Sequence, residues 1–270
     1  MSHGAGPEPA AATDRRIEAG PVPGTARPVL VLDGLTRRFG SLTALGGVSL
    51  RLRAGARHAV IGPNGAGKTT LLNLIAGTER PDEGTVVLDG RDLTRTAPAR
   101  RARFGIARSF QQPTAIGELT VLDNVVLAGW RHRRGRERVE AATRQLAEVG
   151  LADMAHRRAA ELSHGQRRLL DLAAALSCRP RLLLLDEPAA GLTDRDIARL
   201  LDVLGRLPDE VAMLLVEHHT EVVAQLADTV TVLKDGEALV TAATREALGH
   251  PAVREAYLGT GTSRCSNSAD

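Results

Sequence analysis

The stretch Gly62-Pro63-Asn64-Gly65-Ala66-Gly67-Lys68-Thr69-Thr70 decides the fold of this 270-residue chain. The apolar run His58-Ala59-Val60-Ile61 precedes it and predicts a buried strand, and the apolar residues between Thr69 and Ala76 predict a helix. A strand that enters a glycine-rich turn and leaves it as a helix is the repeating unit of α/β proteins. The stretch therefore predicts an α/β fold built around a mainly parallel sheet.

The same nine residues fit the pattern G-x-x-x-x-G-K-[ST], which binds a chain of phosphates. Backbone N–H groups at a helix start meet negative charge with fixed partial positive charges, and Gly65 and Gly67 allow the close approach this requires. Lys68, one of only two lysines, can reach the β- and γ-phosphates, and the Thr69 hydroxyl can ligate Mg²⁺. The predicted nucleotide contacts here are Gly62, Pro63, Asn64, Gly65, Ala66, Gly67, Lys68, Thr69 and Thr70.

An acidic pair follows a second apolar run. Leu182 to Leu185 is apolar throughout, which is typical of a strand buried on both faces, and Asp186 and Glu187 come next. Ligand sites in open α/β sheets lie at the carboxyl ends of strands. Asp186 is therefore placed to hold Mg²⁺ through water, and Glu187 to orient the attacking water or accept its proton. A surface pair that only caps the strand is the alternative, and the phosphate loop upstream argues against it.

The segment Leu162-Ser163-His164-Gly165-Gln166 opens a further apolar helix. Ser163 is a favourable N-cap residue, and Gly165 leaves a backbone N–H exposed in the first turn, so this helix start can bind an anion. Considered alone, the segment is explained equally well by plain helix capping.

The order of these segments resembles that of ABC-transporter ATPases, which have a phosphate loop, a glutamine segment, an LSGGQ signature, an acidic pair and a histidine after a strand. The resemblance covers about residues 30–259. It implies a head-to-tail dimer in which Ser163, Gly165 and Gln166 of one chain cover the ATP held by the phosphate loop of the other.

The resemblance also assigns roles to single residues. It implies that Phe39 stacks on adenine, a core phenylalanine being the alternative. Gln111 is expected to contact Mg²⁺ or the attacking water, with Gln112 as the second choice and a plain loop amide as the alternative. His218 is expected to contact the γ-phosphate, and adjacent His219 is not. The expected catalytic residues are Glu187, His218 and Gln111, and the expected Mg²⁺ ligands are Thr69, Gln111 and Asp186.

Two residues depart from the family pattern. His164 replaces the first glycine of the signature, but Ser163 and Gly165 are the phosphate contacts, so binding should survive. Thr193 stands where the family often has Asp, which leaves the detail of communication across the dimer open.

The chain organisation predicts one ATP-binding domain over 28–259, between a disordered tail at 1–27 and a flexible tail at 260–270. Helical spacing of Ala142, Leu146, Val149 and Leu151 predicts a helical stretch near 119–161 and an inserted helical subdomain at about 113–178. The fold class is thus an α/β P-loop NTPase core with an antiparallel β subdomain and an α-helical insertion. Strands are expected at 29–32, 48–52, 85–88 and 211–216, and a strand hairpin at 230–240. A turn is expected at 81–84. Helices are expected at 195–207, in a segment that ends at 227, and as short helices near Tyr257.

Composition excludes several classes of protein. Aromatic residues make up 2% of the chain, so the core must consist of Leu, Val, Ala and Ile, and base-stacking nucleic-acid binders are disfavoured. Cys178 and Cys265 have no metal-ligand spacing. No apolar run approaches the ~18 residues that cross a bilayer, so any membrane role is expected to act through a partner. The basic cluster Arg131–Arg138 is expected to be a solvated helix end, with contact to acidic phospholipid as the alternative.

The resemblance implies an ATPase subunit of an importer at the cytoplasmic face of the membrane, with ATP and Mg²⁺ as cofactors. The resemblance implies permease subunits, a second ATP-binding subunit of the same or a paralogous chain, and indirectly an extracellular binding protein as partners, and no nucleic acid. The segments 109–114, 188–194 and 255–259 resemble the branched-chain amino-acid and urea uptake branch. A soluble ABC ATPase without a transport role is the main rival, but it usually carries two cassettes or a long coiled coil. A P-loop kinase would lack the Ser163 segment, and a non-hydrolysing module would lack Glu187.

Overall fold

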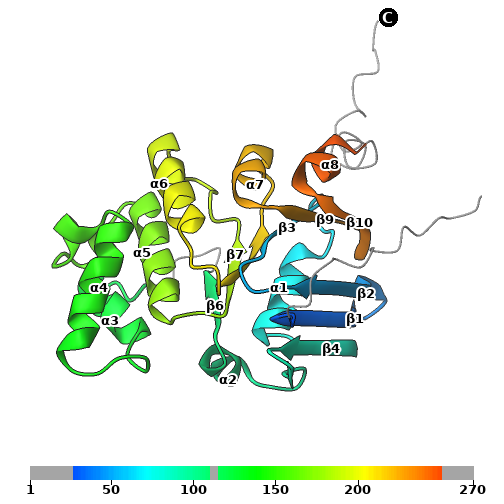
Figure 1. Ribbon diagram of the computed structural model, residues 1–270, viewed down its shortest axis with the longest axis horizontal. Coiled ribbons are helices and arrows are strands. Elements are labelled where there is room, and N and C mark those ends of the chain that lie inside the picture. Colours follow the sequence, from blue (N-terminus) through cyan, green and yellow to red (C-terminus); the bar gives the residue numbers. More distant parts are fainter. Residues whose placement is uncertain (1–26, 110–114, 251–270) are drawn as a thin grey trace, which may run out of the picture.

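The structure is a computed structural model that describes residues 27–109 and 115–250. In these ranges the chain forms two sheets, with helices at one end and over the faces (Figure 1). The strands are β1 Leu30–Phe39, β2 Leu42–Leu52, β3 Arg57–Ile61, β4 Glu83–Leu88, β5 Arg91–Asp92, β6 Ile106–Ser109, β7 Leu182–Asp186, β8 Ala212–Val216, β9 Thr229–Lys234 and β10 Glu237–Ala243. The α-helices are α1 Lys68–Ala76, α2 Pro98–Arg103, α3 Val121–Ala128, α4 Arg136–Glu148, α5 His164–Ser177, α6 Asp194–Gly205, α7 Thr220–Leu226 and α8 Thr244–Gly249.

The larger sheet has the strand order β10-β9-β3-β8-β7-β6. β3 pairs in parallel with both β8 and β9, and β7 pairs in parallel with both β8 and β6. The β9–β10 hairpin is antiparallel, as its Asp-Gly turn predicts. The predicted mainly parallel sheet is therefore confirmed.

The smaller sheet, β2-β1-β4-β5, is antiparallel throughout. Its strands are longer than predicted, because pairing along β1 extends both neighbours. The predicted turn at 81–84 is partly wrong, since β4 begins at Glu83, which pairs with Thr36 of β1. Gly84 has a φ of 85° and lies so close to the Asp33 and Gly34 carbonyls that a Cβ would collide with them, which explains the turn-like residue inside the strand.

The core lies on both faces of the parallel sheet. On β7, Leu183 and Leu185 pack toward α5, α6 and α7, whereas Leu182 and Leu184 pack toward α1 and the antiparallel sheet. The predicted strand buried on both faces is confirmed. The buried hydrophobic residues of the described ranges are aliphatic apart from Met213, as the composition predicts.

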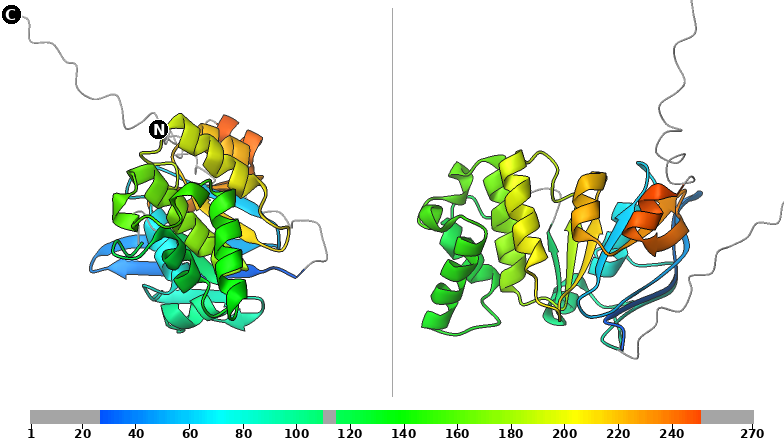
Figure 2. Two further views of the ribbon diagram at one scale, coloured as in Figure 1. Left: turned by 90° about the vertical axis from the view of Figure 1, so that its left-hand side faces the viewer. Right: turned by 45° about the horizontal axis from the view of Figure 1, so that its top comes forward.

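Helices α3, α4 and α5 pack against one another at one end of the molecule, far from the antiparallel sheet (Figures 1 and 2). The predicted apolar face is confirmed, because Ala142, Leu146, Val149 and Leu151 are all buried. The helical stretch expected near 119–161 is broken into α3, α4 and two single 3₁₀ turns, Ala152–Met154 and Ala159–Glu161. The arginine cluster forms the loop between α3 and α4 and the first turn of α4, which are largely exposed.

The elements α2, β5, β6 and α8 were not predicted from the sequence. They are short and lack the apolar runs from which the other elements were inferred. The expected short helices near Tyr257, residues 1–26 of the N-terminal tail and the whole of the C-terminal tail lie outside the described residues. No helix within the described ranges combines the length and apolar character that crossing a bilayer demands.

A buried histidine in β3 makes stability depend on pH. His58 is 4% exposed, and its Nε2 lies 2.8 Å from Thr231 Oγ1 on β9. Burial lowers the pKa of His58 from 6.5 to about 4. Between pH 6.5 and pH 4, His58 binds a proton in the unfolded chain but not in the folded chain. The free energy of unfolding therefore falls as pH is lowered through this range, by at most about 3 kcal/mol. We expect His58→Gln to flatten the decline of Tm over this range in calorimetry, with surface His156→Gln as the control. An unchanged slope in His58→Gln would contradict this.

Candidate nucleotide-binding site

Three adjacent parallel strands bring the predicted site residues to one edge of the sheet. Val216 at the end of β8 pairs with Val60 of β3 on one side and with Asp186 of β7 on the other. The residues that follow these strands therefore leave the sheet side by side, at its carboxyl edge, where ligands bind in this class of fold. The phosphate loop, the acidic pair and the 217–219 turn meet there, and β6, which leads to the glutamine segment, lies next to β7.

The phosphate loop is closely packed around glycine backbone. Gly67 caps α1 with a φ of 96°, and a Cβ there would collide with the Ala44 carbonyl oxygen of β2. Asn64, Gly65 and Thr69 are exposed, so this side of the loop and the first turn of α1 are open to a ligand. Gly65 and Gly67 have φ angles of 82° and 96°, the left-handed backbone that glycine adopts without strain.

Lys68 lies inside the loop. Its Nζ donates to the carbonyl oxygens of Gly62, at 2.7 Å, and Pro63, at 2.9 Å. Burial lowers the pKa of Lys68, and the nearby carboxylates of Glu187 and Asp186 oppose this shift. The ammonium group is thus positioned between the loop carbonyls and the acidic pair, where it can meet the charge of a polyphosphate.

Asp186 is buried at the end of β7 and forms an ion pair that the sequence did not predict. Arg108 Nη2 of β6 lies 2.8 Å from Asp186 Oδ2, with side chains only 8% and 1% exposed. Arg108 also donates to Asn73 Oδ1 of α1 at 2.6 Å. Among the described residues, Asp186 Oδ1 is buried without a hydrogen-bond partner. One carboxylate oxygen is therefore fixed and the other remains available as an acceptor.

Glu187 follows with a φ of 48°, which is unusual for a residue with a side chain. Its N–H donates to Val216 O at 2.8 Å, and its side chain is 28% exposed. Glu187 Oε1 lies 3.9 Å from His218 Nδ1, whose side chain is 47% exposed. The two predicted catalytic side chains are thus neighbours at an accessible edge.

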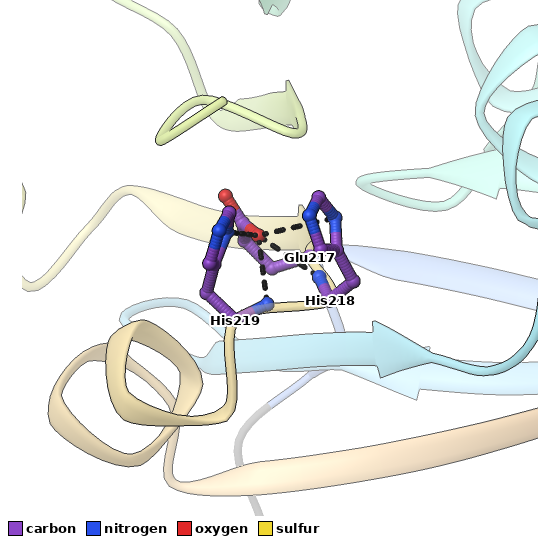
Figure 3. A group of neighbouring side chains, drawn as sticks. All are labelled: Glu217, His218 and His219. Atoms are coloured by element: carbon purple, nitrogen blue, oxygen red, sulfur yellow. Dashed lines mark hydrogen bonds and ion pairs between the residues drawn. The ribbon is translucent and has the colours of Figure 1, made fainter. Parts of the chain in front are cut away.

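Glu217 is a further residue that the sequence interpretation did not single out. It is completely buried directly before His218 and accepts hydrogen bonds from the backbone of His218 and His219 (Figure 3). It also accepts one from the backbone of Ala189, on the turn that follows Glu187. A carboxylate directly after the apolar run of β8 and directly before two histidines was the signal that could have identified it.

Phe39 ends β1 and is 45% exposed, so the alternative of a core phenylalanine is excluded. The Arg37 guanidinium lies 4.6 Å from the centroid of its ring. The neighbouring strand β2 runs past the loop through Ala44, as the close approach to Gly67 shows. The predicted residues Gln111 and Gln112 lie outside the described residues.

The predicted signature segment forms the start of α5. Ser163 Oγ accepts from Gln166 N at 3.2 Å, and Gln166 Oε1 accepts from Ser163 N at 2.9 Å, which makes a reciprocal capping box. Ser163 and His164 are exposed. Gly165 was expected to expose its backbone amide, but in the structure the residue is buried beside Asp196 of α6.

The two departures from the family pattern lie close together. His164 borders Gly191, at which a Cβ would be 3.4 Å from its ring. Thr193 caps α6, because its Oγ1 accepts from Asp196 N at 3.3 Å and donates to Asp196 Oδ2 at 2.8 Å. The 188–194 loop, which follows the acidic pair in the chain, therefore lies against the start of α5.

Comparisons with known proteins agree with this geometry. A sequence model of the family described as ABC transporter matches residues 45–190. The high-affinity branched-chain amino acid transport ATP-binding protein BraF of Pseudomonas aeruginosa is 36% identical, over 87% of this chain and 99% of BraF. Ribose import ATP-binding protein RbsA 1 of Rubrobacter xylanophilus is 38% identical over 78% of this chain, which spans only 43% of RbsA 1.

Solved structures give the same assignment. The crystal structure of the ADP conformation of MJ1267, an ATP-binding cassette of an ABC transporter, superposes with a TM-score of 0.78 and 31% identity over 87% of this chain and 100% of that one. The cassette MJ0796, solved as a dimer in a post-hydrolysis state bound to ADP and Pi, superposes with a TM-score of 0.72 and 29% identity over 80% of this chain and 99% of that one. The fold, the sheet-edge site and these relatives together show that the chain belongs to the ABC transporter family, as one of its ATP-binding, ATP-hydrolysing subunits.

Proposed function

We propose that this chain energises a membrane importer by binding Mg-ATP between two subunits and hydrolysing it with Glu187 and His218. The observation that carries the proposal is the meeting of the Lys68 loop, the acidic pair and His218 at the end of β3, β8 and β7. Fixed amide dipoles and one buried ammonium face a chain of phosphates there. Phe39 stacks on the base, and the start of α5 in the second subunit closes the site, with Ser163 exposed to the ligand and Gln166 and the buried Gly165 behind it.

The residues around Asp186 fit a magnesium ion. The orphaned buried oxygen Oδ1 of Asp186 and the exposed hydroxyl of Thr69 are hard oxygen donors, which Mg²⁺ prefers. Thr69 would hold the ion directly, Asp186 through water, and Gln111 is the third proposed ligand. When bound, the ion would neutralise charge on the β- and γ-phosphates.

The chain's own groups divide the chemistry. Glu187 orients the attacking water or accepts its proton, and its partial exposure leaves the carboxylate reachable from the ligand side. His218 contacts the γ-phosphate and, at 3.9 Å from Glu187, bounds the same small space. Lys68 stabilises the charge that remains on the phosphates. Gln111 is the third proposed catalytic group.

We also propose two protein partners, each assigned to a surface of the chain. We assign a second ATP-binding subunit, of this or a paralogous chain, to the face that bears Ser163 and the phosphate loop, and the dimeric relative MJ0796 supports this. A groove of about 750 Å³ runs between α2, β6, α3 and α5 and is lined in part by Ala102, Arg103, Ala128 and Ala174. A loop of a permease subunit would dock there and place the chain at the cytoplasmic face of the membrane.

Residues 28–259 act as one domain, whose helical part at about 113–178 moves with the permease.

Branched-chain amino acids, urea or related small amides are the proposed cargo. The alignment to BraF covers 99% of BraF and 87% of this chain, whereas the ribose relative has more than half its length outside the match. The cargo itself is bound by an extracellular binding protein and the permease, so the substrate class is carried here by likeness alone.

The two lysines of the chain offer a matched test. Lys68→Ala removes the buried ammonium of the loop, whereas Lys234→Ala removes an exposed one at the end of β9. We expect Lys68→Ala to weaken ATP binding and to reduce phosphate release at least ~100-fold, since a charged group at the phosphates is lost. Lys234→Ala should match the wild type in both measurements. Equal activity of all three proteins would remove the loop from the proposed function.

The same two variants test transport. Cells in which the gene is replaced by either variant are assayed for uptake of labelled leucine, urea and ribose. Loss of leucine or urea uptake with Lys68→Ala, but not with Lys234→Ala, supports the proposed cargo. Loss of ribose uptake alone, or of none, contradicts it.

A further inference from the structure

We infer that Glu217 is a positioning residue that fixes Glu187 relative to His218 during hydrolysis. This rests on the proposed function, because the catalytic roles of those two residues belong to it. Glu217 itself is completely buried, so it acts through the groups that it holds and not on the nucleotide.

The carboxylate of Glu217 accepts four hydrogen bonds. Oε1 accepts from Ala189 N at 3.0 Å, and Oε2 accepts from His218 N at 2.9 Å and from His219 N at 3.1 Å. His219 Nδ1 lies 3.0 Å from the same Oε2 (Figure 3). A buried carboxylate is costly unless it accepts such bonds, and bonds to an ionised acceptor are the stronger kind. The side chain is therefore firmly held in one geometry.

These bonds join the two turns that carry the catalytic side chains. Ala189 lies two residues after Glu187, and the N–H of Glu187 donates to Val216, the residue before Glu217. One hydrogen bond thus holds the 187–189 turn at its first residue and the other holds it at its last. The distance between this turn and the 217–219 turn depends on both hydrogen bonds.

The backbone of Glu187 needs such support. Its φ of 48° lies in the left-handed region, which is strained for a residue with a side chain and persists only where the neighbouring structure holds it. Ala190 N–H closes the turn on Glu187 O at 3.1 Å, but this bond is internal to the turn. Glu217 supplies the side-chain contact that anchors this turn to the turn that bears His218, directly after β8.

A metal site is the competing interpretation of this cluster. One ligand atom from each of Glu217, His218 and His219 lies within 4.8 Å of the others. Oε2 of Glu217, however, already receives two backbone N–H groups, and a metal would have to displace them. The geometry therefore points to positioning.

The test is Glu217→Gln, with Glu221→Gln on the exposed start of α7 as the matched control. The amide keeps the volume but turns one acceptor into a donor that faces other donors. We expect kcat to fall about 10- to 100-fold, as for small misplacements of reacting groups, while KM for ATP changes less than about twofold. KM should hold because Lys68, the charged group of the phosphate loop, is held by the carbonyl oxygens of Gly62 and Pro63. In His218→Ala the second change Glu217→Gln should lower kcat no further, because both act on one step.

The outcomes are distinct. Unchanged kcat in folded Glu217→Gln, a parallel rise of KM, or losses that multiply with His218→Ala would each overturn the inference. If Glu217→Gln folds poorly by circular dichroism, Glu217→Asp replaces it; this keeps the charge but is too short to reach Ala189 and His219 together, so the same kcat loss is expected. Glu187→Gln, assayed in parallel, separates the proposed function from this inference. Full ATP turnover by Glu187→Gln would contradict the proposed function. Loss of turnover in Glu187→Gln together with normal turnover in Glu217→Gln would contradict only this inference.

Discussion

Glu187→Gln should bind ATP and yet release phosphate at least ~100-fold more slowly than the wild type, the range that loss of a general base gives. The substitution keeps the shape of a side chain whose backbone is set by its bond to Val216 O and by the positive φ. It removes the negative charge of the carboxylate and with it the ability to take a proton. The phosphate loop, with its buried Lys68, is untouched, so nucleotide affinity should change little.

The arrested variant should also accumulate as a dimer. ATP closes the proposed dimer and hydrolysis opens it, so a chain that binds without hydrolysing should elute from size-exclusion chromatography as a dimer in Mg-ATP and as a monomer without nucleotide. Glu210→Gln, a surface change of the same kind, should hydrolyse normally and show no such shift. Full turnover by Glu187→Gln would remove that carboxylate from its proposed role.

Local signals explain why much of the fold could be predicted. The apolar strands before the phosphate loop and before Asp186 are continuous because both faces of a parallel sheet are covered, and the structure buries them completely. Ser163 and the apolar spacing of α5 are equally local, and both are confirmed. Each of these features is encoded within about ten neighbouring residues.

The features that could not be predicted depend on residues far apart in the chain. Arg108 looks like one more arginine in a basic stretch, and only the parallel pairing of β6 with β7 brings it to Asp186, 78 residues later. Glu217 is similar, since its partner Ala189 is 28 residues away. The start of β4 at Glu83 was missed because pairing with β1 overrides a local turn signal.

The two departures from the family pattern show the same limit. Thr193 reads in the sequence as the loss of an acidic group, but in the structure it caps α6 together with Asp196. His164 reads as a bulky replacement for glycine, but it lies on the exposed start of α5 beside Gly191, where no Cβ competes for the space. Both substitutions are therefore accommodated by their neighbours.

Arg108→Met should destabilise the chain by about 3–5 kcal/mol, the cost of leaving a buried charge without its partner. Methionine fills a similar volume but cannot neutralise Asp186, which is 1% exposed and already has one unsatisfied oxygen. Asn73 Oδ1 loses a donor at the same time. The measurement is the midpoint and slope of urea unfolding, from which the free energy of unfolding follows.

A double-mutant cycle isolates the ion pair from the loss of packing. Adding Asp186→Asn to Arg108→Met removes the orphaned charge, so the double variant should recover most of the lost stability and show a coupling of about 2 kcal/mol or more. The comparison pair is Arg181–Asp89, at a similar 3.2 Å but with both side chains 40% exposed, where Arg181→Met should cost less than about 1 kcal/mol. Burial is what separates the two pairs, because water screens one charge and is excluded from the other. A loss in Arg108→Met no larger than that in Arg181→Met would mean that Asp186 finds another way to be solvated, and that the link from β6 to the proposed magnesium ligand is not what holds it.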